Sequence, residues 1–299
     1  MPELPDVTIY IEALERYVGG AVLEKLRIAS PFLLRSVDPP VDSVEGKTIH
    51  SFRRLGKRIV FCFDDELFLA LHLMIAGRLR WKTRGQKIPK KVGLAAFDFA
   101  EGTLLLTEAS PKKRASLYVV RGETSLHEHD PGGLEVMESS LDAFRGALTR
   151  ENHTLKRALT SPHLFSGIGN AYSDEILHAA QLSPLKRTRQ LSDEEIKRLH
   201  AQTIATLSKW IDHLRTELGD GFPDKVTAFR DDMAVHGKFR QPCPACGAPV
   251  QRIVYAQNEA NYCAKCQTGG KLLVDRAISR LLRDDWPKTL DEWEMPADS

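Results

Sequence analysis

The spacing of apolar residues divides the chain into an N-terminal helix, a strand-rich stretch and a second helical stretch. Val7, Ile11, Leu14 and Val18 recur at helical spacing. Pro5 suits the first turn of that helix because its φ is fixed and it has no N–H to leave unsatisfied. The pattern then changes to short runs rich in β-branched and aromatic residues, separated by turns. The predicted strands cover residues 22–29, 59–63, 67–72, 94–99, 103–107 and 116–120.

This succession of short strands predicts a β-sandwich or a barrel, interrupted by a polar, basic loop at residues 84–91. Residues 130–133, Asp-Pro-Gly-Gly, predict a boundary, and beyond it the apolar period becomes helical. Ser192 and Glu195 form the pattern of a capping box before a long helix. The predicted helices cover residues 140–148, 154–159, 170–181 and 192–218.

Charge is nearly balanced over the chain but unevenly distributed along it. Lys and Arg number 42 against 40 Asp and Glu, a formal net charge of +2, so the net charge excludes no class of partner. Basic residues nevertheless gather in clusters, which fit either a polyanion-binding face or solvated loops. The clusters are Arg53, Arg54, Lys57 and Arg58; Arg78, Arg80, Lys82, Arg84, Lys87, Lys90 and Lys91; and Lys112, Lys113 and Arg114.

The chain carries no pattern of membrane insertion or secretion. No apolar run approaches the roughly 20 residues of a membrane span. Acidic Glu3 and Asp6 stand where a secretory signal has basic residues. We therefore expect a cytoplasmic protein with no membrane partner. In that compartment, cysteines in paired C-x-x-C spacing indicate a metal site rather than disulfides.

Four of the five cysteines form such a pattern. Cys243, Cys246, Cys263 and Cys266 are spaced C-x2-C-x16-C-x2-C, within the range of a four-cysteine zinc site. Residues 251–255 have a strand pattern, so we expect a β-hairpin pinned by one zinc ion. Four thiolates leave no open coordination position, and the zinc is therefore expected to be structural. The alternative, a redox dithiol, needs a C-x-x-C near a βαβ unit, which the pattern lacks.

The first residues combine features of a reactive amine. Pro2 permits removal of Met1, which leaves a secondary amine able to attack an electrophilic carbon. The helix that follows places its positive end near this amine and disfavours protonation. Glu3 stands beside it, in a position to move a proton. The same residues are also typical of an ordinary helix start, so this stretch alone does not decide between the two.

Two glycines open another predicted helix. In residues 167–170, Gly-Ile-Gly-Asn, the glycines allow close backbone approach, and a helix N-terminus offers free N–H groups to a phosphate. Asn170 adds a side-chain donor. A turn between two helices, with Asn170 capping the second, explains the same residues equally well.

Together these pieces resemble the formamidopyrimidine-DNA glycosylase and endonuclease VIII family. The resemblance extends from residue 1 to about residue 268 and has five anchors in the family's order. They are residues 2–5 (Pro-Glu-Leu-Pro), Gly56 with Lys57, residues 167–170, residues 234–237 (Ala-Val-His-Gly) and the four cysteines. The zinc spacing is specific, the other motifs are short, and their shared order makes coincidence improbable.

The resemblance implies a multidomain α+β protein. It implies an N-terminal β-sandwich with an N-terminal helix over residues 1–130, a helix-two-turn-helix domain over 134–225 and a zinc-finger hairpin over 235–270, followed by a C-terminal extension at 271–299. It also implies a DNA partner, duplex with a damaged base or an abasic site, bound by a monomer in the cleft between the domains.

The resemblance further implies a base-excision repair enzyme, a bifunctional DNA glycosylase and abasic-site lyase. The damaged nucleotide is flipped out of the duplex, Pro2 attacks C1′ of its sugar, and Glu3 assists ring opening and proton transfer. The resulting iminium leads to strand cleavage by elimination. Lys57 counts with the catalytic residues because it matches the family lysine that contacts a phosphate at the lesion. Asn170 matches an asparagine with the same role.

The chain departs from the family pattern at the zinc hairpin. The family usually carries an arginine there that grips phosphates, whereas this position holds Asn258. An amide donates hydrogen bonds without the charge that makes such bonds about twice as strong. We expect weaker binding or an altered flipping step, unless Arg252 or Lys265 compensates.

Two further departures concern the loops that the resemblance places against the DNA. Ile75 stands at the family's usual methionine wedge position, with Met74 beside it, and either of them can wedge into the base stack or belong to the core. The segment that probes the opposite base holds Lys112, Lys113 and Arg114 without the usual aromatic residue. The lesion and its opposite base therefore stay open.

Beyond Cys266 the chain continues for about thirty residues. Leu272, Leu273, Ile278, Leu281 and Leu282 predict an amphipathic helix before an acidic tail, which packs on the finger or recruits a partner.

A rival hypothesis is a protein of the same fold that binds damaged or abasic DNA without cutting it. The missing hairpin arginine and the altered probing loop favour this rival. Retention of both Pro2 and Glu3 argues against it, because a pure binder has no need of an amine beside a carboxylate.

Overall fold

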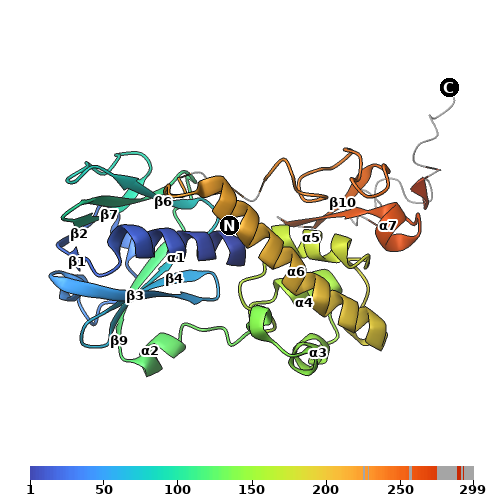
Figure 1. The fold of residues 1–299 in the computed structure, drawn as a ribbon, viewed down its shortest axis with the longest axis horizontal. Helices are drawn as coiled ribbons and strands as arrows, with labels where there is room; N and C mark the ends of the chain where they lie inside the picture. The colour runs from blue at the N-terminus through green and yellow to red at the C-terminus, as the bar shows by residue number, and fades with distance from the viewer. Residues whose placement is uncertain (225, 228, 256–257, 275–287, 291, 293–299) are drawn as a thin grey trace. The chain divides into compact units, whose positions relative to one another are not determined.

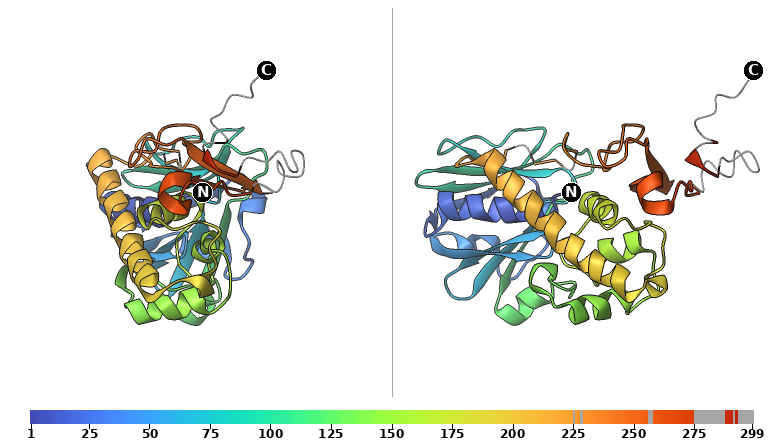
Figure 2. Two further views of the ribbon diagram at one scale, coloured as in Figure 1. Left: turned by 90° about the vertical axis from the view of Figure 1, so that its right-hand side faces the viewer. Right: turned by 45° about the vertical axis from the view of Figure 1, so that its right-hand side comes forward.

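The computed structural model describes all residues except 225, 228, 256–257, 275–287, 291 and 293–299. The chain forms two compact units (Figures 1 and 2). The first contains Met1–Pro131 and Lys209–Ala228, and the second contains Gly132–Ser208 and Phe229–Ser299. Helix α6, Asp193–Leu218, contributes residues to both units.

The first unit is a β-sandwich built from two antiparallel sheets. One sheet has the order β1-β3-β4-β5-β9 and the other has the order β2-β7-β8-β6. The strands are β1 Val22–Leu23, β2 Lys25–Ile28, β3 Lys47–Leu55, β4 Arg58–Phe63, β5 Leu67–His72, β6 Gly77–Lys82, β7 Gly93–Phe99, β8 Gly102–Glu108 and β9 Ser116–Arg121. The helices of this unit are α1 Leu4–Val18, η1 Pro31–Leu33, η2 Val41–Val44 and α2 Glu123–His127.

Aromatic side chains from both sheets meet in the core of the sandwich. Phe61 of β4 stacks on Phe97 of β7, with ring centroids 5.6 Å apart and planes 3° from parallel. Phe52 of β3 meets Phe61 edge-on at 4.8 Å. All three rings are buried, and each aromatic pair stabilises the core by about 0.5–1.5 kcal/mol beyond its area burial.

Helix α1 bridges the two sheets. The Glu15 carboxylate accepts a 2.7 Å hydrogen bond from the backbone N–H of Phe52 in β3, and Tyr17 meets Trp81 of β6 edge-on at 5.4 Å. Val7, Leu14 and Val18 are buried as their helical spacing predicts, whereas Ile11 is only half-buried. The N-terminus lies where this helix begins (Figure 1).

The second unit combines short helices with the zinc-finger hairpin. Its elements are η3 Val136–Glu138, α3 Leu141–Thr149, α4 Leu155–Thr160, α5 Asn170–Ala179, η4 Thr188–Gln190, the first part of α6, β10 Val250–Tyr255, β11 Asn258–Cys263 and α7 Ala264–Thr268. The helix starts follow the predicted caps: Ser140 accepts from Ala143 N–H, and Ser192 and Glu195 exchange hydrogen bonds of 2.9 and 3.2 Å.

The predicted fold class is confirmed, with corrections in detail. Residues 22–29 form two strands in different sheets, because the chain crosses from β1 to β2 at Glu24. Strands β3 and β6 were not predicted. In β6, the basic residues Arg78, Arg80 and Lys82 alternate with Leu79 and Trp81, whose side chains point inward. The basic residues dominate the pattern, so this strand was interpreted from the sequence as a basic cluster.

The amphipathic helix predicted after the finger does not begin at Leu272 and Leu273, as the sequence pattern suggested. Residues 271–274 are not helical, and Ile278, Leu281 and Leu282 lie outside the described residues. The buried side chains of Leu272 and Leu290 pack with Ile253 and Tyr262 of the hairpin. Residues of the extension therefore pack against the finger.

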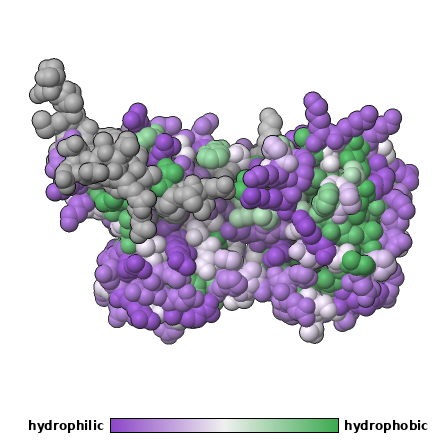
Figure 3. All heavy atoms as spheres, turned by 180° about the vertical axis from the view of Figure 1, so that it is seen from behind, coloured by the Kyte–Doolittle hydropathy of each residue, from purple (hydrophilic) through white to green (hydrophobic). Residues whose placement is uncertain are grey.

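Polar residues dominate the coloured surface of the face drawn in Figure 3, with apolar residues gathered at its right-hand side. In the part of the chain that the structure describes, no helix combines the length and apolar character needed to cross a membrane.

Candidate active site and zinc centre

The chain terminus lies at the start of α1, with Met1 half-buried. Pro2 is buried, and Glu3 is only 3% exposed. Glu3 is the N-cap residue of α1: its N–H donates to the Asp6 carboxylate at 3.0 Å, and its carbonyl accepts from Val7 N–H. Pro5 lies in the first helical turn as expected. A carboxylate and the chain terminus are thus held side by side at the positive end of a helix.

The terminal amine lies in surroundings that disfavour its protonated form. Burial lowers the pKa of the Met1 amine, the nearby carboxylates of Glu3 and Asp6 oppose this shift, and the positive charges of Arg78 and Lys57 add to it. An amine with a lowered pKa is more often unprotonated near neutral pH, as a nucleophile must be.

Lys57 lies near the terminal amine and follows a tight turn. Gly56 has φ +62°, a left-handed conformation that favours glycine, and it turns the chain between β3 and β4. The Lys57 charge influences both the terminal amine and His72. The structure therefore brings Lys57 near Pro2 and Glu3, from which the sequence separates it by more than fifty residues.

His72 joins this group, although no motif in the sequence indicated a role for it. Burial, followed by the charges of Arg58 and Lys57, lowers its pKa to about 4, so the imidazole is neutral at pH 7. Its Nδ1 accepts a 3.2 Å hydrogen bond from Met74 N–H, which leaves Nε2 as the protonated nitrogen. One feature of the sequence could have indicated a role for His72: it ends a predicted strand and directly precedes the loop that the family resemblance places against the DNA.

The loop after His72 presents an apolar side chain to solvent. Ile75 is 59% exposed, and Met74 is half-buried with φ +53°. Neither residue belongs to the core, which takes Leu73 instead. Gly77 closes the loop, since a Cβ there would lie 2.2 Å from the Leu73 carbonyl oxygen. The loop is thus shaped to display Ile75.

The segment with Lys112, Lys113 and Arg114 is anchored by a buried carboxylate. Glu108 is 1% exposed and accepts from the backbone N–H groups of Arg114 and Ala115 at 2.9 and 3.1 Å. Lys113 donates to the Glu108 carbonyl, so its ammonium serves the loop itself. Lys112 and Arg114 are exposed.

In the second unit, Gly169 is the N-cap of α5 and Asn170 is the first helical residue. The alternative in which Asn170 caps the helix is therefore wrong. The Asn170 carbonyl accepts a 2.6 Å hydrogen bond from Lys156 Nζ, which also pairs with Asp174 at 2.5 Å. Lys156 was missed by the sequence analysis because its partners lie on another helix.

Asp174 and Glu175 of α5 bind the segment that leads into the zinc finger, residues 234–236. Asp174 also accepts from His236 Nδ1 at 2.8 Å and from the Asn261 amide at 3.2 Å. Glu175 accepts from the backbone N–H groups of Ala234, Val235 and His236 at 2.8–3.0 Å. Both carboxylates are buried, and each has several donors, as a buried charge requires.

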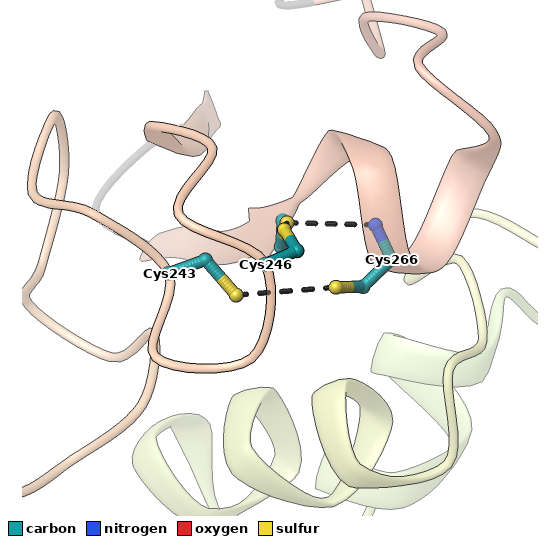
Figure 4. A group of neighbouring side chains, drawn as sticks. Cys243, Cys246 and Cys266 are labelled. Atoms are coloured by element: carbon teal, nitrogen blue, oxygen red, sulfur yellow. Dashed lines mark hydrogen bonds between the residues drawn. The ribbon is translucent and has the colours of Figure 1, made fainter.

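The four predicted cysteines converge on one point, and Figure 4 shows Cys243, Cys246 and Cys266 of this cluster. Their sulfur atoms all lie within 4.8 Å of one another. The Sγ atoms of Cys243 and Cys266 are 3.9 Å apart, and those of Cys246 and Cys263 are 3.4 Å apart. Zn–S bonds of ~2.3 Å in a tetrahedron place sulfurs about 3.8 Å apart, so the cluster fits one zinc ion.

The surroundings of the cluster call for a cation. Burial raises the pKa of the Cys263 thiol to about 11 and also raises that of Cys266, whereas at Cys246 burial is outweighed by hydrogen bonds, which lower the pKa. Four thiolates in such surroundings need a compensating positive ion, and zinc supplies it. His178 of α5 adds a contact, with its Nε2 lying 3.2 Å from Cys243 Sγ. Cys62 takes no part and is buried in β4, as expected.

Asn258 begins β11, and its backbone pairs with Tyr255 across the hairpin. Its side chain lies outside the described part of the structure. Arg252, on the facing strand, is exposed.

Known proteins match this chain in both sequence and structure. The family model of the formamidopyrimidine-DNA glycosylase N-terminal domain matches residues 1–116, that of the H2TH domain of the same enzyme matches residues 133–218, and that of a zinc finger found in FPG and IleRS matches residues 240–269. The chain belongs to the formamidopyrimidine-DNA glycosylase family.

Individual relatives agree with this assignment. An uncharacterized formamidopyrimidine-DNA glycosylase-like protein of Mycobacterium tuberculosis is 38% identical over 151 residues, 50% of this chain and 94% of that protein. The formamidopyrimidine-DNA glycosylase of Desulforamulus reducens is 28% identical over 89% of this chain and 99% of its own length.

Solved structures of the family superpose well. A structure of MutM in complex with DNA containing carbocyclic 8-oxo-G has a TM-score of 0.79 and 26% identity, covering 89% of this chain and 100% of that one. A complex of Lactococcus lactis Fpg with DNA containing an abasic site has a TM-score of 0.77 and 26% identity, covering 89% and 99%.

Proposed function

We propose that this chain excises damaged bases from DNA and cleaves the resulting abasic site, with Pro2 as the nucleophile. It acts in base-excision repair as a DNA glycosylase with lyase activity and a structural zinc finger. The observation that carries the proposal is the environment of the terminus: burial lowers the pKa of the Met1 amine, and the buried Pro2, whose nitrogen becomes the terminus once Met1 is removed, lies near Glu3, Lys57 and His72.

In the proposed reaction, the target nucleotide leaves the base stack and its C1′ meets the Pro2 nitrogen. The nitrogen forms a bond to C1′, and the bond from C1′ to the base breaks, so that the base departs with the proton that the amine loses. Glu3 donates the proton that opens the sugar ring, which gives an iminium between C1′ and Pro2. The iminium acidifies the C2′–H bond, and loss of that proton expels the 3′ phosphate; a second elimination releases the 5′ phosphate.

The remaining site residues position the DNA. Lys57 is placed to bind a phosphate beside the reacting sugar, and the exposed Ile75 is placed to fill the gap left by the flipped nucleotide. In the second unit, Asn170 offers its side chain and the N-terminal end of α5 to a phosphate. Lys112 and Arg114 contact the DNA at the probing loop, while Lys113 shapes that loop.

Each proposed segment has its own role. Residues 1–130 carry the chemistry, residues 134–225 and 235–270 hold the DNA, and residues 271–299 are a C-terminal extension. We propose a monomer acting in the cytoplasm on duplex DNA with a damaged base or abasic site, because one chain carries both the amine and the DNA-holding elements.

Borohydride trapping on abasic DNA tests the proposal. The wild-type chain, with Met1 removal verified by intact mass, should form a covalent adduct. Pro2→Leu retains Met1, because a large second residue blocks its removal, and should trap no adduct. Glu3→Gln should slow base excision by roughly 100-fold or more, the usual contribution of a proton-transferring group. Absence of an adduct from a wild-type chain lacking Met1 would favour the non-catalytic binding protein instead.

A panel of duplexes with oxidised purines, oxidised pyrimidines, ring-opened bases and abasic sites then identifies the lesion. This panel is necessary because the chain differs from the family pattern at Ile75 and at residues 112–114. These positions are proposed to contact bases rather than the DNA backbone, so they influence which lesion is excised.

A further inference from the structure

Two arginines converge on one aromatic ring in the zinc-finger part of the second unit. The Cζ atoms of Arg252 and Arg240 lie 4.4 and 5.3 Å from the centroid of the Phe239 ring. The segment with Phe239 and Arg240 is fastened beside β10, since Arg240 N–H donates to the Val250 carbonyl at 2.8 Å. Both arginines are exposed, and the Arg252 side chain keeps 45% of its accessible surface. The ring thus orients two guanidinium groups that face solvent.

This arrangement carries a cost in the free protein. Arg240 has φ +68°, a left-handed conformation in which a Cβ is strained. Two like charges beside one ring also repel each other. The cation–π contacts with Phe239 offset part of this cost.

In the described part of the chain, acidic side chains offset little of the remaining repulsion between the two arginines. Glu259 approaches Arg252 only to 3.9 Å, at the outer limit of an ion pair. Among the described residues, Arg240 makes no ion pair. A bound anion would relieve the repulsion and use both guanidinium groups, each of which offers paired N–H donors suited to phosphate.

We propose that Arg240 and Arg252, oriented by Phe239, form a phosphate-binding clamp through which the zinc finger grips the DNA backbone. The choice of DNA as partner rests on the proposed function. The clamp supplies positive charge to a finger that carries uncharged Asn258 in its hairpin. Because it recognises phosphate, the clamp contributes affinity without sequence preference.

The salt dependence of DNA binding tests the clamp. The affinity of the full-length, zinc-loaded protein for a duplex with a stable abasic-site analogue is measured over a range of salt concentrations. Removal of one arginine–phosphate interaction should reduce the slope of log K against log [salt] by about 0.9. The variants are Arg240→Gly and Arg252→Gln, each expected to remove one such interaction. Arg189→Gln is the matched control, since Arg189 is an exposed arginine on η4 of the same unit.

The Arg240→Gly variant distinguishes a loss of DNA binding from a loss of folding stability. Glycine relieves the left-handed strain, so this variant should melt at or above the wild-type temperature while it binds DNA more weakly. Phe239→Leu keeps both charges but removes their orientation, so its affinity should fall severalfold at every salt concentration with the slope unchanged. Zinc content should stay at one ion per chain in all variants.

Wild-type slopes in both arginine variants, or an equal change of slope in Arg189→Gln, would overturn the clamp. A Phe239→Leu variant with wild-type affinity would overturn the orienting role of the ring. The trapping assay stays a separate criterion. If the wild-type protein forms an adduct but the variants have unchanged slopes, only the clamp hypothesis is rejected. If the slopes fall but no adduct forms, only the proposed chemistry is rejected.

Discussion

At the scale of single residues, several arginines that cluster in the sequence serve local structure. Arg54 donates to the Gly56 carbonyl at 2.9 Å and Arg58 to that of His129 at 2.8 Å. Arg53 pairs with Glu123 and lies over the Phe68 ring at 4.9 Å. A basic cluster in the sequence therefore does not by itself define a DNA-binding face, because the same charge can satisfy a carbonyl or a carboxylate nearby.

Arg78 combines a structural contact with an electrostatic effect at the proposed active site. Its Nη1 donates to the carbonyls of Ile75 and Gly77 at 3.2 and 2.7 Å, which holds the exposed loop. Its charge also adds to the effect of burial in lowering the pKa of the Met1 amine.

Removing the Arg78 charge should therefore raise the pKa of the Pro2 amine, which becomes the terminus at this place once Met1 is removed. The adduct-forming rate falls as pH drops through this pKa, so in Arg78→Gln the fall should begin at a higher pH and the rate at pH 6 should be severalfold lower. Arg78→Lys keeps the charge and should keep the wild-type pH profile, although it loses the paired carbonyl contacts. Arg80→Gln, on the same strand and exposed, serves as the control. The measurement is the initial trapping rate as a function of pH, and identical profiles in all four proteins would contradict the prediction.

His72 should make the stability of the first unit depend on pH. Its pKa is about 4 in the folded chain against an ordinary value of 6.5, so the unfolded chain binds the extra proton first. Stability should therefore be fully present above pH 6.5 and should fall as pH drops from 6.5 toward 4. His72→Asn, which keeps an acceptor for Met74 N–H, should lose less stability over this window. Chemical unfolding at pH 7 and pH 4.5 measures the difference, and equal losses in both proteins would exclude His72 as the cause.

At the scale of elements, caps and turns were predicted where short-range chemistry decides them. Ser140 and Ser192 begin helices because their side chains satisfy free N–H groups within three residues. Strand β6 was missed because its outward positions are all basic, and the alternation with Leu79 and Trp81 becomes visible only when β8 pairs beside it. Residues 22–29 were assigned one strand because sequence alone does not show a change of sheet.

The elements of the second unit meet at the buried pair Lys156–Asp174, whose side chains are 4% and 0% exposed. Lys156→Met should leave Asp174 charged and short of a cation, which costs about 3–5 kcal/mol for a buried pair. The second unit should unfold at a lower denaturant concentration, and DNA affinity should fall because Lys156 also holds the Asn170 carbonyl. Lys197→Met, at an exposed position of α6, provides the control and should change neither quantity.

At the scale of the whole molecule, zinc should stabilise one unit and not the other. The cysteines, α5 and residues 234–237 belong to the second unit, whereas the sandwich core contains none of them. Chelation should therefore lower the unfolding temperature of the second unit and abolish DNA binding, while the first unit keeps its transition. Calorimetry with and without a chelator measures both transitions, and a shift of both by the same amount would contradict this division.

The sequence by itself determined the zinc site and the order of the family's motifs. Cysteine spacing is a local property, and a tetrahedral four-sulfur site allows few alternatives. The pairing of a terminal proline with Glu3 is local as well. Helix periods and capping residues also act within a few positions, so the elements that depend on them were predictable.

Only the tertiary structure decided which distant residues share a site. His72 was recognised as neutral because burial and the charges of Arg58 and Lys57 act on it through space. Asp174 gathers Lys156, His236 and Asn261 from 18, 62 and 87 residues away. Phe239 likewise meets Arg252 only because β10 folds back beside the preceding loop. Desolvation and Coulomb interaction depend on distance in space, and a residue pattern records only distance along the chain.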